Sequence, residues 1–241
     1  MKVPDIIESR ISRLPVGYVF TYEDFNLPVE KVDALTKALS RLVQEGKIRK
    51  LSPGRFYKPR RTDFGELKPE VYQVVKDLLE KDVKILGYLT GYSSYNQLGL
   101  TTQVSGIIQI GTNEPKKNIT RGIYRIRFIK QPNKITKENI PLLRILDATR
   151  NIKEIPDATV QDSCKTLMVL IKKINQEDRE NVVRLAKKYN PAARALAGAM
   201  IDLCFGSNIA EPLLKSLNPS SEYEFGISDS ILPNKLKWNI R

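Results

Sequence analysis

Eight cationic side chains and a single acid, Glu45, lie between positions 41 and 61 of the chain. Guanidinium and ammonium groups at this density can bind phosphate oxygens, because neutralising a polyanion releases its condensed counterions. The 241-residue chain has a formal net charge of +13, yet positions 151–241 hold 13 basic and 11 acidic residues and are close to balance. The positive charge is therefore concentrated towards the N-terminus, where it favours a polyanionic partner.

The residues before and around these cations predict a series of short helices and strands. Apolar residues at helical spacing predict a first helix over 3–14, and residues 18–21 are typical of a short strand. Thr21 can then cap a small helix over 22–25 by accepting a hydrogen bond from its first turn. A third helix is expected from Val29 to Glu45, ending at Gly46, a residue suited to the left-handed conformation after a helix.

A β-hairpin is expected directly after the third helix. Its strands, 47–51 and 55–58, enclose a Ser-Pro-Gly turn. Helix, strand, two helices and a hairpin in this order predict a winged helix-turn-helix. The third helix is expected to bury Val32, Leu35, Leu39, Leu42 and Val43. Its opposite face is expected to present Lys31, Lys37, Ala38, Arg41 and Gln44.

A helix fits the major groove of B-DNA, where base edges display a distinguishable pattern of donors and acceptors. The hairpin would act as a wing on the DNA backbone or in the adjacent minor groove. The expected DNA-binding residues are Lys31, Lys37, Arg41, Arg49, Lys50, Arg55, Lys58, Arg60 and Arg61. The alternatives to DNA binding are that the cationic helix face is simply solvated, or that the winged helix binds another protein.

Three further arginines, Arg121, Arg125 and Arg127, lie near or within a β-like run over 123–129. This run and another over 104–111 flank a Pro-Lys-Lys-Asn turn and are expected to pair. Arg125 and Arg127 fall on one strand face. All three arginines are candidates for additional DNA contacts or for contacts to an acidic partner, and a solvated face is the alternative.

Residue types argue against catalysis. The chain has no histidine, so the commonest general base and the commonest zinc ligand are both missing. Cys164 and Cys204 lie in apolar helical patterns and are expected to be free, buried thiols. The acids do not form the paired strand carboxylates that a nucleotidyltransferase needs for Mg²⁺, and no glycine-rich phosphate loop is present. We expect a protein without enzymatic activity, metal or cofactor.

Several segments resemble a known family. Residues 38–42, 45–48 and 54–57 are similar to many bacterial winged-helix regulators. Gly87-Tyr88-Leu89-Thr90-Gly91 and the run 95–103 resemble the AbiEi-like antitoxins of type IV toxin–antitoxin systems, as do 64–67 and 121–128. The resemblance covers roughly residues 15–130. It implies that the N-terminal winged helix represses its own promoter and that the partner is a nucleotidyltransferase toxin, countered functionally or by direct binding.

Together these patterns predict an α+β protein. The expected organisation is a DNA-binding domain over 1–61, a linker over 62–69, and a mixed α+β, mostly helical domain over 70–241. No apolar run of membrane-spanning length and no signal-peptide core are visible, so a cytoplasmic protein is expected. The alternatives to an antitoxin are a protein-interaction scaffold and a solitary transcriptional regulator.

Overall fold

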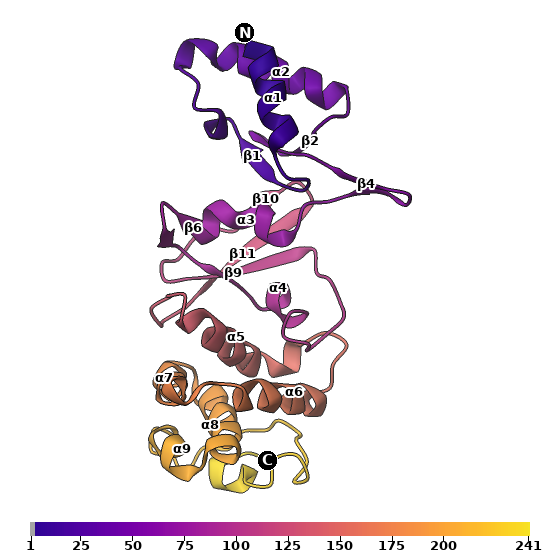
Figure 1. The fold of residues 1–241 in the computed structure, drawn as a ribbon. Helices are drawn as coiled ribbons and strands as arrows, with labels where there is room; N and C mark the ends of the chain where they lie inside the picture. Colours follow the sequence, from indigo (N-terminus) through magenta and orange to yellow (C-terminus); the bar gives the residue numbers. More distant parts are fainter. Residues whose placement is uncertain (1–2) are drawn as a thin grey trace. The chain divides into compact units, whose positions relative to one another are not determined.

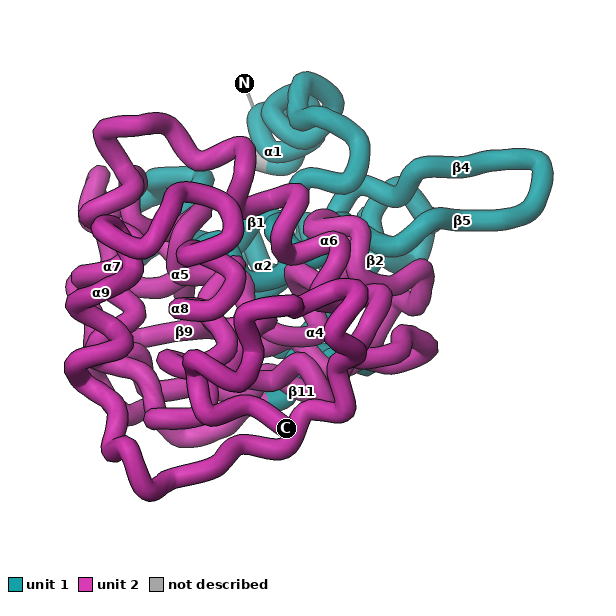
Figure 2. The backbone as a smooth tube through the Cα atoms, turned by 90° about the horizontal axis from the view of Figure 1, so that it is seen from below, with its two compact units in different colours: residues 1–77, 120–124 teal, residues 78–119, 125–241 magenta. Residues whose placement is uncertain are grey.

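The computed structural model describes residues 3–241. The chain folds as an α+β protein that divides into two compact units (Figures 1 and 2). Unit 1 comprises residues 1–77 and 120–124, and unit 2 comprises residues 78–119 and 125–241.

Unit 1 contains a winged helix. Its elements are α1 (Val3–Arg13), β1 (Val19–Thr21), a 3₁₀ turn (Glu23–Phe25), a second 3₁₀ turn (Val29–Lys31), α2 (Val32–Gln44), β2 (Arg49–Ser52) and β3 (Arg55–Tyr57). The three strands form an antiparallel sheet in the order β1-β3-β2. The predicted element order is confirmed, although a single 3₁₀ turn takes the place of the small second helix.

The core of unit 1 is the apolar face of α2 packed against α1 and the sheet. Leu35, Leu39 and Leu42 are buried, as predicted, together with Phe20 and Phe56, whose rings stack at 6.1 Å. Val43, expected to be buried, is only partly buried, and two other assignments on α2 were wrong. Ala38 is buried rather than on the polar face, and Val32 is 41% exposed, because the helix begins only at Val32 and its first turn extends beyond the core.

Local hydrogen bonds set the ends of these elements. Thr21 does not act as the predicted cap acceptor. Instead, its backbone N–H and its hydroxyl both donate to the Asp24 carboxylate, at 2.6 and 3.1 Å. The prediction for Gly46 is confirmed: it follows α2 with a φ of +71°, and the next amide, Lys47 N, donates to Leu42 O at 3.0 Å.

The residues expected to form a linker are mostly ordered structure. Strands β4 (Arg60–Thr62) and β5 (Gly65–Leu67) form a second hairpin. Unit 1 then continues into α3 (Val71–Leu79) as far as Asp77. The compact unit therefore extends past the predicted domain end at 61, because Asp77 makes hydrogen-bonded ion pairs with other residues of the unit.

Unit 2 begins with short strands and a four-stranded sheet. The strands are β6 (Glu80–Lys81), β7 (Lys84–Ile85), β8 (Tyr88–Thr90), β9 (Ile107–Thr112), β10 (Ile119–Arg121) and β11 (Tyr124–Lys130). The sheet order is β10-β11-β9-β8, with the end of the β10–β11 hairpin assigned to unit 1. The expected pairing of the two β-like runs occurs, but β9 and β11 are parallel. The chain reverses twice between them, once on each side of β10, whose three residues include a single apolar side chain and so show no strand pattern in the sequence.

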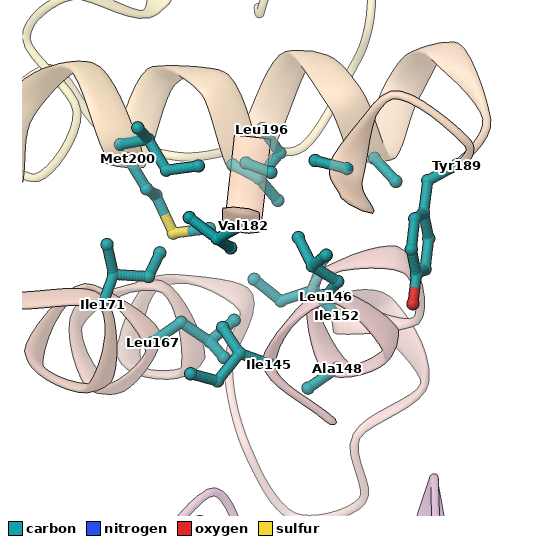
Figure 3. Packing of buried hydrophobic residues seen from close by; sticks show 14 of the residues in the cluster. Ile145, Leu146, Ala148, Ile152, Leu167, Ile171, Val182, Tyr189, Leu196 and Met200 are labelled. Carbon is teal, nitrogen blue, oxygen red and sulfur yellow. The ribbon is translucent and has the colours of Figure 1, made fainter. Parts of the chain in front are cut away.

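Helices make up most of unit 2. They are α4 (Tyr92–Tyr95), α5 (Asn139–Arg150), α6 (Val160–Lys172), α7 (Arg179–Ala186), α8 (Pro191–Phe205) and α9 (Ser207–Leu214). Figure 3 shows how their apolar side chains meet. Leu146 of α5 and Leu167 of α6 pack towards α8, which carries Leu196 and Met200.

Both cysteines are free thiols, Cys164 buried and Cys204 partly buried. None of the helices in the described chain has the length and apolarity to span a bilayer.

A buried carboxylate fixes α5 in unit 2. Asp147 is 2% exposed and accepts hydrogen bonds from the hydroxyls of Tyr88, Thr90 and Tyr189, the last two at 2.6 and 2.8 Å. Arg150, one turn later, supplies a cation at 3.5 Å. Burial and the neighbouring charge of Asp147 raise the pKa of both tyrosines, which keeps them protonated as donors.

A second buried carboxylate holds the C-terminal segment. Trp238 is fully buried against α8, and Gly198 makes this possible: a Cβ there would lie 2.0 Å from the indole ring. The indole N–H donates to Asp202 at 3.0 Å, and Lys237 donates to the same oxygen at 2.7 Å. Burial raises the pKa of Asp202, but the hydrogen bonds from its neighbours outweigh it and lower the pKa to about 2.

This site gives unit 2 an acid-sensitive contribution to stability. Because the folded-state pKa of Asp202 lies below the usual 3.8, its contribution is present above pH 4 and is lost as the pH falls from about 4 to about 2. We expect wild type to exceed Asp202→Asn in free energy of unfolding by about 2 kcal/mol more at pH 5 than at pH 2. The measurement is urea unfolding followed by fluorescence of Trp238, the one tryptophan of the chain. A difference that does not change with pH would contradict the assignment.

Candidate nucleic-acid interface

The exposed face of α2 carries a continuous row of polar side chains, which we call the α2 stripe. Its members are Asp33, Thr36, Lys37, Ser40 and Gln44. All are exposed and recur every three or four residues, so they lie on one face of the helix, opposite the buried leucines. Lys37, Ser40 and Gln44 make no side-chain hydrogen bond or ion pair within residues 3–241, and Thr36 donates only to Val32 O, at 3.0 Å. The stripe offers a carboxylate in the first turn of the helix, at Asp33, and beyond it hydroxyl, amide and ammonium groups that are available to a ligand.

Arg41, expected beside Lys37 as a DNA contact, lies at the edge of this face and is paired within the protein. Its guanidinium is 3.8 Å from Glu8 of α1 and 3.4 Å from Glu45. Lys47 binds the same two acids, and its hydrogen bond holds the pKa of Glu8 below its usual value. Arg41 therefore helps to fix the end of α2 against α1.

The wing between β2 and β3 is packed inside unit 1. Leu51 and Ser52 are buried, and Arg55 donates to Asp77 of α3 at 2.8 Å. The carbonyl of Leu51 also lies against Gly122: a Cβ at Gly122 would be 2.5 Å from that oxygen, and its φ is +57°. The wing is therefore less free than was expected: α3 and residues 120–124 pack against it, and Arg55, predicted to contact DNA, has an intramolecular partner.

Arg121, predicted as a possible further contact to DNA or a partner, likewise bonds within unit 1. It is 5% exposed and donates to Val74 O at 2.7 Å. Its two terminal nitrogens bind the two Asp77 oxygens, at 2.6 and 2.8 Å. Burial raises the pKa of Asp77, but the bonds from Arg121 and Arg55 bring it below its usual value. Asp77 thereby joins the wing, α3 and the 120–124 turn.

Two other predicted contacts also have intramolecular partners. Lys58 donates to Ser12 O at 2.8 Å and to Leu14 O at 3.3 Å, so it caps the C-terminal end of α1. Arg49 forms a two-point ion pair with Glu66, at 2.7 and 2.9 Å. Both side chains stabilise unit 1.

The remaining predicted cations of unit 1 are available for a ligand. Lys31, Lys37, Lys50 and Arg60 are exposed and unpaired within the described residues, and Arg61 is exposed but bonded to Gly46 O at 2.9 Å. Sequence reasoning did not select Thr36, Ser40 and Gln44 as site residues. Their helical spacing with Lys37 was the available signal, but the selection considered charge alone.

Arg125 and Arg127 belong to unit 2. They lie on β11 and are both exposed, whereas Ile126 between them is buried, so the predicted shared face is confirmed. Neither arginine has a side-chain partner in the described part of unit 2. No group of acids and cysteines that could hold a metal ion occurs in residues 3–241.

Fold and exposed stripe together define the class: a two-unit α+β protein with an N-terminal winged helix. Residues 6–182 match a family of unknown function, DUF6088, and the chain belongs to this family. The crystal structure of the RV2827C protein from Mycobacterium tuberculosis is similar, with a TM-score of 0.62, 14% identity, and coverage of 98% of this chain and 89% of that one. At this identity the likeness concerns the fold alone. No curated protein matches the chain.

Proposed function

We propose that this protein binds DNA through the α2 stripe and represses its own promoter. The observation that carries this proposal is the set of unpaired polar side chains on one face of α2, with Lys37 at its centre. Amides and hydroxyls on a helix in the major groove can bond to base edges, and lysine can bind a purine edge or a phosphate. Three unpaired cations, Lys31, Lys50 and Arg60, supply further phosphate contacts.

The proposed biological role is that of an antitoxin in a type IV toxin–antitoxin system. Its support is the resemblance of residues 87–91, 95–103 and 121–128 to AbiEi-like antitoxins. The partner would be a nucleotidyltransferase encoded beside this chain, countered by direct binding or through regulation. In this role the protein binds DNA as a repressor and catalyses no reaction.

An electrophoretic shift on the DNA upstream of the gene tests the DNA-binding part. We expect the full chain to bind this DNA at least a thousandfold more tightly than a random duplex of equal length, the lower end of the range for sequence-specific regulators. Log affinity should fall steeply with log salt, because several cations contact phosphates. Equal affinity for both duplexes would contradict specific recognition, and no binding at low salt would contradict DNA binding altogether.

Co-expression tests the antitoxin part separately. Cells that express a neighbouring nucleotidyltransferase should stop growing, and the full chain expressed from an unrelated promoter should restore growth. Failure to restore growth would reduce the proposal to a transcriptional regulator.

A further inference from the structure

The β4–β5 hairpin, residues 60–67, is a defined arm that extends away from the other elements of unit 1 in both views (Figures 1 and 2). Arg60 pairs with Leu67, Arg61 with Glu66, and Thr62 with Gly65. The Thr62 hydroxyl also donates to Gly65 O at 2.8 Å, which closes the turn. Phe64, in this turn, is fully exposed.

The base of the arm is braced against the end of α2 and against β2. Glu66 accepts two hydrogen bonds from Arg49 and lies 3.5 Å from Arg61, whose guanidinium also donates to Gly46 O. The bonds from Arg49 hold the pKa of Glu66 below its usual value, so this brace is ionised at neutral pH. The arm is therefore held in place next to the helix that carries the α2 stripe.

Charge is distributed unevenly along the arm. Arg60 and Lys68 are exposed and unpaired within the described residues, and both lie at the base. The negative charge of Glu66 is compensated by its ion pairs with two arginines. Asp63, in the turn, is therefore the one unpaired acid of the arm. Cations at the base and a ring at the tip suit a ligand with phosphates near the base and an apolar surface beyond them.

Phe64 has no role in the folded unit. Hairpin turns favour glycine, asparagine and aspartate, and a ring without neighbours contributes nothing to the core. The wing of unit 1 packs in part against α3 and keeps only Lys50 and Pro53 exposed, whereas residues 60–67 of the arm are all exposed. Stacked bases are the apolar surface that lies between phosphates in DNA, and apolar side chains that enter the minor groove can separate base steps.

We propose that the arm is a second DNA contact, in which Arg60 and Lys68 bind phosphates and Phe64 inserts between base pairs from the minor groove. This inference rests on the proposed DNA-binding function. Insertion unstacks a base step and bends the duplex, so the arm should determine both affinity and DNA shape.

The test compares the full-length wild type with Phe64→Ala and Phe64→Leu on a duplex of the upstream region labelled at both ends for energy transfer. We expect Phe64→Ala to lose affinity about tenfold or more and to lose the bend, with an unchanged salt slope. Phe64→Leu should retain most of both, because leucine also acts as an apolar wedge. Arg60→Ala should flatten the salt slope by about one unit.

The outcomes separate the two proposals. If the wild type binds no DNA, the proposed function fails. If the wild type binds and Phe64→Ala matches it in affinity and bend, the arm proposal alone is overturned. If Phe64→Ala instead changes the sedimentation of the free protein and leaves DNA affinity unchanged, the arm is an interface between copies, which also overturns it. Far-UV circular dichroism checks that each variant is folded.

Discussion

Replacing Asp147 by alanine is expected to lower the free energy of unfolding of unit 2 by about 3–5 kcal/mol. The substitution leaves the hydroxyls of Tyr88, Thr90 and Tyr189 without their acceptor in the interior. It also leaves Arg150 without its carboxylate partner. Chemical denaturation followed by Trp238 fluorescence measures the effect, because Trp238 reports on unit 2.

Two further variants show whether the network or the position causes this loss. Asp147→Asn keeps the side-chain size and one acceptor oxygen, so we expect a smaller loss of about 1–3 kcal/mol. Glu211→Ala removes the exposed ion pair between α9 and Lys215, the residue that follows it, and should change stability by less than about 0.5 kcal/mol. If Asp147→Ala were no more destabilising than Glu211→Ala, the buried network would not stabilise unit 2.

The triple substitution Lys37→Ala, Ser40→Ala and Gln44→Ala is expected to lower affinity for the upstream DNA about a hundredfold or more. Each well-placed contact to a base edge discriminates by about 1–3 kcal/mol, and every 1.4 kcal/mol is tenfold. Affinity for random DNA should fall much less, because only Lys37 of the three carries a charge that neutralises a phosphate. Electrophoretic shifts on both duplexes measure the two losses.

Matched controls address charge and folding. Lys165→Ala also removes one exposed lysine, but from α6, and should leave both affinities unchanged. All three α2 side chains are exposed and unpaired, so the triple variant should remain folded by circular dichroism. An equal loss on specific and random DNA would mean that the stripe contributes charge but no base recognition. Unchanged affinity on both would place the DNA-binding surface elsewhere.

Local pattern alone determined much of the fold. Apolar residues at helical spacing predict helices over 71–79, 139–150 and 191–205, and these bounds coincide with α3, α5 and α8. Helical periodicity and end signals arise from residues a few positions apart, which the sequence displays directly. The same reasoning predicted the order of helices and strands in the winged helix and the stop of α2 at Gly46.

Tertiary structure decided which cations are free. The sequence pattern predicts that Arg55 and Arg121 are available to contact DNA. In the structure both bind Asp77, at sequence separations of 22 and 44 residues. Arg49 is paired with Glu66 in the same way, whereas Lys37 has no partner in the described chain. A charge density along the sequence cannot show these differences, because an ion pair depends on where distant segments meet. The sequence determined that cations are dense between positions 41 and 61, and the fold selected the few that remain available to bind a ligand.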